Sequence, residues 1–308
     1  MGKALLVVNR RARQAQQKLA DTMTQLHACG LDWIEVAPAQ SSDIPVAIRQ
    51  HQHQVDRVVI AGGDGTLNAA IPGLLDTQLP LGILPLGTAN DLARTLGIPT
   101  DLADACKILT TGQVNRIDIG QVNDRYFFNV ASIGLSVQVT HKLNRETKQQ
   151  WGILAYPIAA LQALRRSRPF WASVWLDDGD LKRMKTMQLA VGNGRYYGGG
   201  MTVTADATIN SHYFDVYSLN LQHWWQLLAI LPAMRSGDHT SWSFVDAFRA
   251  QTITIKTAHP MPINTDGEIT TYTPATFQVL PQAISVFCGQ PVDSIADHSA
   301  QVVVSQEQ

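Results

Sequence analysis

The first part of the chain alternates short hydrophobic runs with segments whose hydrophobic residues recur at helical spacing. The runs are rich in valine, leucine and isoleucine, which is typical of buried strands. The predicted strands are Ala4–Val8, Trp33–Ala37, Arg57–Ala61 and Leu81–Leu84. The predicted helices are Arg13–Ala28, Asp43–His53, Asp91–Leu96 and Asp101–Leu109. This alternation predicts a mostly parallel sheet covered by helices on both faces, with any ligand bound at the carboxyl ends of the strands.

The pattern changes near Asn129, where strands begin to follow one another across turn residues. Asn123-Asp124 and the segment Asp177–Asp180 are typical of hairpin turns. Two helical segments, Trp151–Arg166 and Gln222–Arg235, interrupt the strands. The predicted strands are Val114–Val122, Arg125–Val130, Phe170–Leu176, Arg183–Val191, Met201–Thr204, Tyr213–Leu219, Thr252–Thr257 and Thr276–Leu280.

These patterns predict two domains, which is also what 308 residues favour. Residues 1–128 form an α/β domain, and residues 129–287 form an antiparallel β-sandwich. Residues 288–308 are polar and weakly patterned, so they either pack back on the first domain or fray.

Composition excludes several classes of protein. Hydrophobic residues make up 45% of the chain and charged residues 16%, which argues against disorder. The net charge of −1 gives no reason to expect a nucleic-acid partner. The three cysteines have no metal-type spacing and fit a reducing cytosol, and no segment is long enough to span a membrane. We therefore expect a cytoplasmic protein.

The most informative stretch is Gly62-Gly63-Asp64-Gly65-Thr66-Leu67-Asn68, which follows a predicted strand and leads into a helix. Its glycines leave backbone N–H groups uncovered, so phosphate oxygens can approach them, and the helix adds its positive end. A carboxylate at the centre of this loop would repel phosphate unless a cation were bound, so the loop indicates a nucleotide with Mg²⁺. The alternative interpretation is an ordinary glycine turn.

Two further stretches carry polar groups at strand ends. In Pro85–Arg94, Thr88 and Asn90 can bind a ligand and Asp91 can share a cation with Asp64, although either Asn90 or Asp91 is equally a helix N-cap. In Asp266-Gly267-Glu268, two carboxylates flank a glycine, which suits a general base in phosphoryl transfer. Asp-Gly is equally typical of a plain hairpin turn.

Taken together and in this order, the three stretches resemble lipid kinases with a diacylglycerol-kinase-type catalytic domain. This family includes soluble bacterial diacylglycerol kinases and, more distantly, sphingosine and ceramide kinases. The resemblance extends from Asn9 to about Phe287, with weaker support from Arg116–Gly120, Phe128-Asn129 and Val191–Asn193. It implies a fold shared with NAD kinases and diacylglycerol kinases, and transfer of the γ-phosphate of ATP to a lipid hydroxyl in a cleft between the domains.

The resemblance also implies roles for individual residues. Glu268 would accept the hydroxyl proton, with Asp266 beside it as a second catalytic carboxylate. An acidic network would hold the catalytic Mg²⁺ partly through water, and it comprises Asp64, Asp91 and Asp118. The residues expected around ATP are Asn9, Ser41, Gly62, Gly63, Asp64, Gly65, Thr66, Leu67, Asn68, Thr88 and Asn90.

Two departures from the family pattern affect these expectations. The usual Asn-Pro-x-Ser-Gly segment near the phosphates is replaced by Asn9–Gln14, which lacks the proline and the glycine. A second, structural metal site of the family matches Thr208, Ser211 and Tyr213, but Ser211 stands where an aspartate is usual. A hydroxyl is a poorer Mg²⁺ ligand than a carboxylate, so the pattern predicts weaker binding there.

The segment 142–168 has basic residues at both ends of a hydrophobic, tryptophan-led stretch. It either contacts the inner face of the membrane peripherally or forms a core helix with charged ends. The sequence leaves open whether the protein is a homodimer. It also leaves open two alternatives to a lipid kinase, namely an NAD kinase-like enzyme and a non-catalytic regulator that binds nucleotide or lipid.

Overall fold

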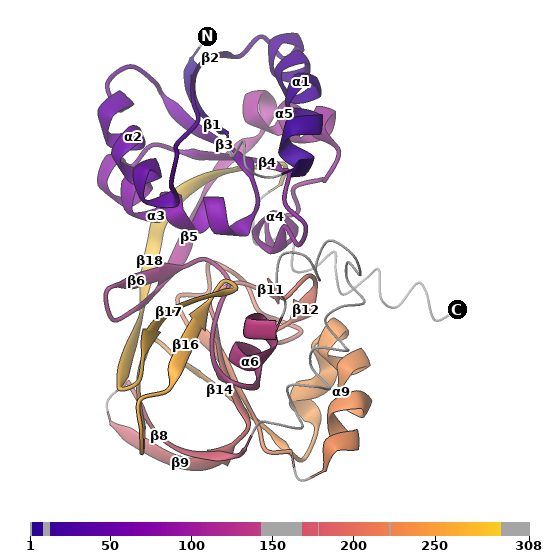
Figure 1. The fold of residues 1–308 in the computed structure, drawn as a ribbon, viewed down its shortest axis with the longest axis vertical. Coiled ribbons are helices and arrows are strands. Elements are labelled where there is room, and N and C mark those ends of the chain that lie inside the picture. The colour runs from indigo at the N-terminus through magenta and orange to yellow at the C-terminus, as the bar shows by residue number, and fades with distance from the viewer. Residues whose placement is uncertain (1, 9–12, 143–167, 178, 222, 291–308) are drawn as a thin grey trace. The chain divides into compact units, whose positions relative to one another are not determined.

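The computed structural model describes residues 2–8, 13–142, 168–177, 179–221 and 223–290 (Figure 1). These residues form two compact units. Unit 1 contains the residues up to Ile119, the short segment Thr208–Asn210 and the described residues from Pro281 onward. Unit 2 contains Gly120–Ala207 and Ser211–Leu280. The predicted helix Trp151–Arg166, most of the basic segment 142–168 and the tail beyond residue 290 lie outside the described residues.

Unit 1 is built on a parallel sheet with the strand order β2-β1-β3-β4. The last part of β18 (Ala275–Cys288) runs parallel to β4, with Val286 beside Leu81. β3 and β4 are almost entirely buried, which is why they read as continuous hydrophobic runs. The four strands are β1 (Lys3–Val8), β2 (Asp32–Val36), β3 (Arg57–Gly62) and β4 (Leu81–Pro85).

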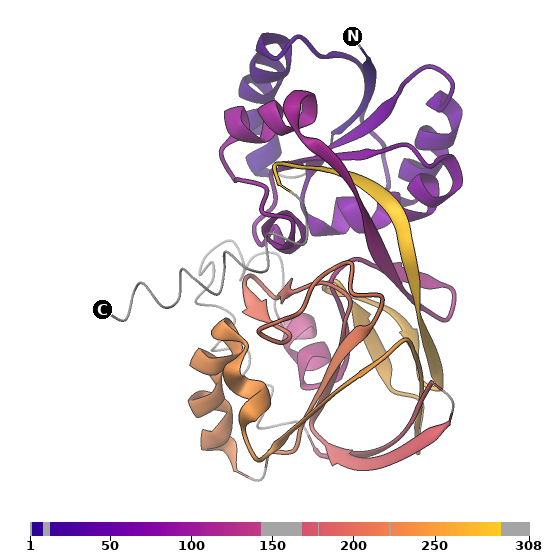
Figure 2. The same cartoon turned by 180° about the vertical axis from the view of Figure 1, so that it is seen from behind.

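Helices cover both faces of this sheet, as the sequence predicts (Figures 1 and 2). The helices α2 and α3 pack together, and α1 packs on α5. The carboxylate of Asp101 caps α5 by accepting a hydrogen bond from the backbone nitrogen of Asp104. The helical elements are α1 (Arg13–Ala28), the 3₁₀ turn η1 (Ser41–Asp43), α2 (Ile44–His51), α3 (Asp64–Thr77), α4 (Asp91–Thr95) and α5 (Leu102–Thr111).

Unit 2 is an antiparallel β-sandwich, which confirms the predicted fold class. One sheet has the order β14-β13-β10-β7-β16-β17, and the other contains β15, β8 and β9 beside the first residues of β18. One buried cluster joins the two sheets through such residues as Phe214, Val216, Ile255 and Phe277. The strands are β7 (Val130–Gly134), β8 (Phe170–Leu176), β9 (Asp180–Thr186), β10 (Gln188–Gly192), β13 (Phe214–Leu219), β14 (Val245–Ala250), β15 (Thr252–Thr257), β16 (Pro262–Thr265) and β17 (Glu268–Tyr272).

Smaller elements complete unit 2. The strand β5 (Gln113–Val122), which begins in unit 1, forms the predicted hairpin with β6 (Arg125–Phe127), and β11 (Tyr196–Tyr197) pairs with β12 (Met201–Thr202). A second buried cluster contains side chains of β13 and of α9 (Trp224–Ser236). Among the described residues, no helix is long and apolar enough to cross a membrane.

The structure corrects some strand and helix predictions. Arg183–Val191 is not one strand, because β9 ends at Thr186 and β10 begins at Gln188 in the other sheet. Thr186 lies at this crossing in the interior, where its hydroxyl is within hydrogen-bond distance of the carbonyl oxygens of Gln188 and Leu219 and accepts from the nitrogen of Gln188. The helix α6 (Leu135–Lys142) and the strand β14 were not predicted.

Candidate active site

The first glycine-rich stretch lies at the carboxyl end of β3. β3 ends at Gly62, and α3 begins at Asp64 with Gly63 as its extended N-cap. The backbone nitrogens of Thr66 and Leu67 donate to the carbonyl oxygen of Gly63. Asp64 therefore lies in the first turn of a helix, whereas the sequence predicted it at the centre of a loop.

The second glycine turn touches the first. A Cβ atom on Gly87 would lie 2.5 Å from the Cα atom of Gly63, and one on Gly63 would lie 2.9 Å from the Cα atom of Gly87. The backbone nitrogen of Leu86 also donates to the carbonyl oxygen of Gly62. Because side chains at either glycine would separate them, the two turns expose bare backbone side by side at the carboxyl ends of neighbouring parallel strands.

Asn90 braces the second turn. Its Oδ1 accepts a hydrogen bond from the nitrogen of Gly87 at 2.9 Å, and its Nδ2 donates to the oxygen of Gly87 at 3.1 Å. Asn90 has a left-handed backbone with φ of 52°, and its side chain does not cap α4. Asn90 therefore stands at the N-cap position of α4, as one interpretation of the sequence had it, but without a capping hydrogen bond from its side chain.

Two of the predicted metal ligands lie near one another. The Oδ1 atom of Asp64 accepts a hydrogen bond from the backbone nitrogen of Leu92, the residue after Asp91, at 3.1 Å. Asp91 itself is buried. Asp118 on β5 is also buried, and its Oδ1 accepts from the nitrogen of Gln282. Among the described residues, no three His, Cys, Asp or Glu side chains are grouped to hold a metal ion.

In unit 2, the carboxylate of Asp266 is held by backbone amides. Its Oδ2 accepts a hydrogen bond from the nitrogen of Phe128 at 2.7 Å, and its Oδ1 accepts from Asn129 and Val130, each at 3.0 Å. The Asp266 nitrogen returns a hydrogen bond to the oxygen of Val130. Asp266 and Gly267 both have positive φ, and Glu268, which follows them, is exposed at the start of β17. The two carboxylates thus have different environments, although the sequence grouped them as catalytic.

The segment Phe128–Val130 is also held by the two residues that follow β10. The Nδ2 atom of Asn193 donates to the oxygen of Phe128, and the nitrogens of Asn193 and Gly194 both donate to the oxygen of Asn129. A Cβ atom on Gly194 would lie 2.8 Å from Oδ1 of Asn129, so a glycine fits best there. Sequence reasoning noted Phe128-Asn129 and Val191–Asn193 as minor motifs, and it gave Asn193 no role.

Asn264 is a second residue that the sequence did not single out. Its Oδ1 accepts a hydrogen bond from the nitrogen of Gly267 at 2.8 Å, which fixes the turn between β16 and β17. The signal available in the sequence was an Asn two residues before the Asp-Gly pair, because Asn side chains commonly bond to nearby backbone.

The other predicted nucleotide-binding residues belong to unit 1. Ser41 begins η1, which lies against α3, and both Ser41 and Thr88 are exposed. Thr66 and Leu67 are buried in α3, so Leu67 contributes to the core, whereas Gly65 is exposed and Asn68 is half-buried. Asn9 and the following residues to Ala12 lie outside the described residues.

The expected second metal site lies in a loop that Arg249 holds in place. Arg249 pairs with Asp206 at 2.8 Å and with Asp215 at 2.5 Å. Burial raises the pKa of the Asp215 carboxyl, and the hydrogen bond from Arg249 acts in the opposite direction. Between these aspartates, the Ser211 hydroxyl donates to the carbonyl oxygen of Tyr213. Thr208 belongs to unit 1 and Ser211 and Tyr213 to unit 2, and the role of all three as metal ligands stays a prediction.

Two family models match the chain. The diacylglycerol kinase catalytic domain matches residues 3–122, and the YegS C-terminal NAD kinase beta sandwich-like domain matches residues 129–288. A diacylglycerol kinase of Staphylococcus saprophyticus is 30% identical over 275 residues, which covers 88% of this chain and 90% of the relative. A diacylglycerol kinase of Staphylococcus carnosus is 26% identical over 280 residues, which covers 90% of this chain and 91% of the relative.

The fold also matches a solved structure. The crystal structure of a diacylglycerol kinase from Bacillus anthracis superposes with a TM-score of 0.78 at 24% identity. The match covers 93% of this chain and 96% of that one. This similarity concerns the fold, and it extends over both units.

The contact between the two glycine turns predicts that Gly87→Ala destabilises the protein. The added methyl group would meet the Cα atom of Gly63 and the Oδ1 atom of Asn90, and such overpacking costs about 1–3 kcal/mol. The control is Thr88→Ala in the same turn, where the side chain is exposed and the expected change is within about 0.5 kcal/mol. Urea denaturation measures both, and equal midpoints for Gly87→Ala and the wild type would contradict the close approach.

The hydrogen bonds to Asp266 predict a graded response to substitution. Asp266→Ala removes the acceptor of three backbone N–H groups and should cost about 3 kcal/mol, because each unsatisfied donor is expensive. Asp266→Asn keeps one oxygen acceptor and should cost less. Asp246→Ala on the exposed side of β14 is the control, with little change expected. Urea denaturation should rank the variants in that order, and a loss no larger for Asp266→Ala than for Asp246→Ala would argue against the role of these bonds.

Proposed function

The chain belongs to the family of lipid kinases with a diacylglycerol kinase catalytic domain, and we propose that it transfers the γ-phosphate of ATP to the hydroxyl group of diacylglycerol or a related lipid with the help of Mg²⁺. The observation that carries this proposal is the turn Asp266-Gly267-Glu268. Its first carboxylate is engaged by three amides, and its second is exposed at the start of a strand.

The bare backbone at Gly63 and Gly87 supports a nucleotide site. Phosphate oxygens can approach backbone closely where no side chain covers it. The N–H group of Gly87 itself donates to Asn90, so the other amides of these turns would have to meet the phosphates. The first turn of α3 follows directly after Gly63, so its backbone N–H groups and its helix dipole favour an anion at the same place. In this proposal the phosphates of ATP lie against these two turns, with Thr88, Ser41 and Asn68 as further contacts.

Asp64 and Asp91 fit a magnesium ion that is shared with the phosphates. Mg²⁺ in nucleotide sites is usually held by one or two carboxylates together with phosphate oxygens and water, so a cage of three carboxylates is not required. Asp118 would act at longer range through water. When bound, Mg²⁺ supplies positive charge that offsets the charge of the phosphate oxygens during transfer.

Glu268 is proposed as the general base, because it is the exposed carboxylate of its turn. It would take the proton of the lipid hydroxyl while that oxygen bonds to the γ-phosphorus and the bond to the β-phosphate oxygen breaks, leaving ADP. Asp266 is then a positioning residue. It fixes the turn that carries Glu268 and has both oxygens committed to the backbone of Phe128, Asn129 and Val130.

The proposal is tested with the purified full-length protein, radiolabelled ATP and Mg²⁺. Three acceptors are offered in parallel: diacylglycerol in detergent micelles, a bacterial lipid extract, and NAD. Labelled lipid is the expected result. Labelled NADP in place of labelled lipid would assign the chain an NAD kinase activity, and nucleotide binding without transfer to any acceptor would make it a non-catalytic regulator.

The role of Asp64 gives a second prediction. Asp64→Asn keeps an oxygen that can accept from Leu92 but removes the charge, so Mg²⁺-dependent binding of ATP should weaken roughly tenfold or more. The control is Asp76→Asn in the same helix, whose exposed carboxylate pairs with Arg49. Calorimetric titration with and without Mg²⁺ measures the difference. An unchanged response to Mg²⁺ in Asp64→Asn would refute the assignment.

A further inference from the structure

One face of unit 2 combines an exposed and a half-buried tryptophan with basic side chains. The residues of β8 alternate, so that Ala172, Val174 and Leu176 enter the core and Trp171 and Trp175 point to the other side. The same side of β9 and β15 carries basic residues and one leucine. We call this set the Trp–Lys face, and it consists of Trp171, Trp175, Leu181, Arg183, Lys185 and Lys256.

The strand register brings these side chains together. Trp171 stands opposite Lys185, and Trp175 stands opposite Leu181. Trp171 is 63% exposed and Leu181 is 43% exposed, and together with Trp175 they form one apolar patch on the surface, which is more informative than a single exposed residue. The Nζ atom of Lys256 lies 5.1 Å from the ring centroid of Trp175, so its charge is held against the aromatic surface.

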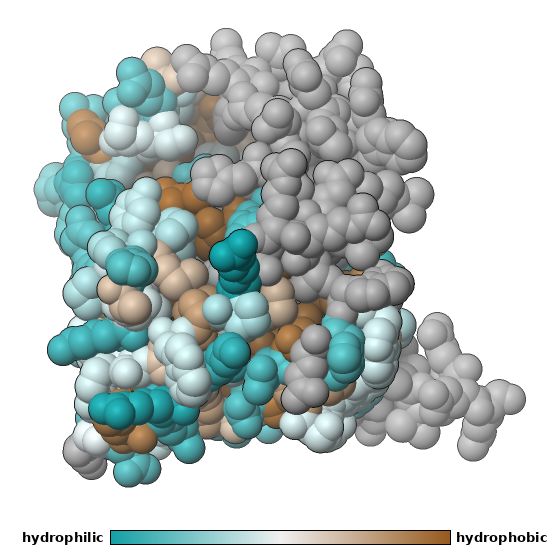
Figure 3. Space-filling model, turned by 60° about the horizontal axis from the view of Figure 1, so that its bottom comes forward, coloured by the Kyte–Doolittle hydropathy of each residue, from teal (hydrophilic) through white to brown (hydrophobic). Residues whose placement is uncertain are grey.

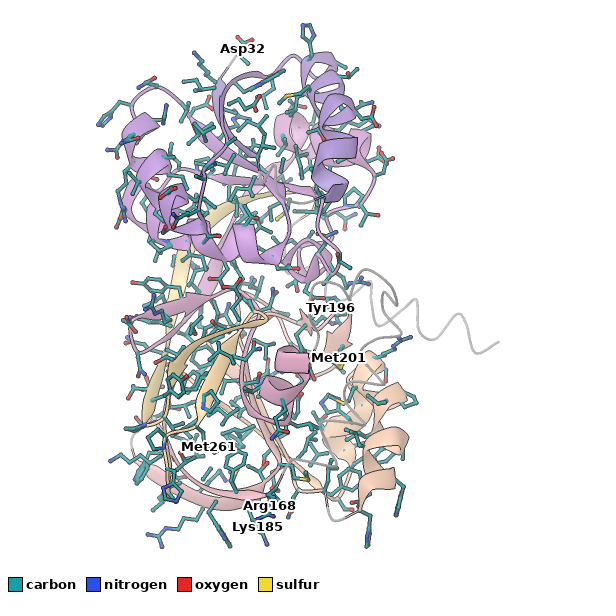
Figure 4. All side chains as sticks on the ribbon, viewed as in Figure 1. Asp32, Arg168, Lys185, Tyr196, Met201 and Met261 are labelled. Atoms are coloured by element: carbon teal, nitrogen blue, oxygen red, sulfur yellow. The ribbon has the colours of Figure 1, made fainter. Side chains whose placement is uncertain are left out.

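The positive charges of this face are close together. Arg183 and Lys256 flank Ser173 on the two neighbouring strands, which places them roughly 10 Å apart. Lys185 follows two residues after Arg183 on the same side, and Figure 4 shows its place on unit 2. This separation slightly exceeds the Debye length of about 8 Å in physiological salt, so the repulsion between these cations is partly screened.

Negative charges lie toward the far end of the hairpin. β8 and β15 contain no Asp or Glu, and the acidic residue of β9 is Asp180, five residues from Lys185 or roughly 17 Å along the strand. The carboxylate of Asp177 at the turn already accepts hydrogen bonds from the nitrogens of Gln251 and Thr252. In Figure 3, which brings the bottom of Figure 1 forward, hydrophobic side chains lie among strongly hydrophilic ones. The face is therefore both amphipathic and cationic.

We propose that the Trp–Lys face docks on the surface of an anionic lipid bilayer. Tryptophan rings favour the boundary between head groups and acyl chains, and arginine and lysine are attracted by anionic head groups. The choice of a bilayer as the occupant rests on the proposed function, because an enzyme acting on a membrane lipid gains from residence at the membrane. The surface differs from the basic segment 142–168 considered from the sequence.

Two alternative roles for the Trp–Lys face predict different results. Basic residues on an edge strand such as β9 can serve simply to prevent pairing with another strand. A second copy of the chain is disfavoured as the occupant, since two such faces would oppose their cations. Neither alternative role accounts for two tryptophans on the solvent side of β8.

Binding to vesicles tests the proposal without depending on catalysis. The full-length protein is sedimented with vesicles of phosphatidylglycerol and phosphatidylcholine, and in parallel with vesicles of phosphatidylcholine alone. Each basic residue near an anionic surface contributes roughly a fivefold factor to binding, so the double variant Arg183→Gln/Lys185→Gln should bind anionic vesicles about 25-fold more weakly. Trp171→Ser should also weaken binding, and high salt should weaken the wild type.

Matched controls come from other surfaces of the chain. Lys107→Gln/Arg125→Gln removes the same charge from residues that pair with their own aspartates, and Trp225→Ser removes another exposed tryptophan. Equal losses in these controls, or no binding of the wild type to anionic vesicles, would overturn the proposal. The proposal would also be overturned if analytical ultracentrifugation showed a dimer of the wild type and the variants of the Trp–Lys face abolished that dimer.

Transfer to detergent-dispersed lipid should be unchanged in all variants. Binding without any lipid phosphorylation would contradict the proposed function alone.

Discussion

The hydrogen bonds between one carboxylate and three successive backbone amides determine the form of the candidate site in unit 2. Asp266 holds Phe128, Asn129 and Val130 from one side, and Asn193 holds the same segment from the other. A charged acceptor makes stronger hydrogen bonds than a neutral one, so this arrangement favours a single conformation of the turn. The exposed carboxylate of Glu268 follows directly after that turn. The position of Glu268 therefore depends on the hydrogen bonds that the neighbouring Asp266 makes.

In unit 1, the candidate site is shaped by contact between two glycine turns and not by a central side chain. Gly63 and Gly87 bring two strand ends into backbone contact, and Asn90 closes the second turn with its own amide. The result is backbone without covering side chains beside the positive end of α3, which an anion can approach closely. Asp64 and Asp91 add negative charge at the same place, which makes sense when a cation accompanies the phosphates.

Much of this fold could be predicted from the sequence, because local patterns determine it. Buried parallel strands read as continuous hydrophobic runs, and the turn at Asn123-Asp124 has a residue pair that favours a hairpin. The break at Met187 was missed, although the hydrophobic positions change phase there, from Met184 to Met187 and Leu189. The sequence identified candidate site stretches, but it did not reveal the contacts that hold them in place. An Asp-Gly pair does not reveal that its carboxylate binds amides more than 130 residues away, and Asn193 gives no local sign of its contact with Phe128.

The central claim is that Glu268 performs the proton transfer while Asp266 positions it. The most direct test is the rate of a single turnover of Glu268→Gln with ATP, Mg²⁺ and diacylglycerol, together with its dissociation constant for ATP. Gln keeps the size of the side chain but cannot accept the proton, so the rate should fall by roughly 10²–10⁴-fold while ATP binding stays at the wild-type value. A rate near that of the wild type, or a loss of ATP binding, would contradict the account.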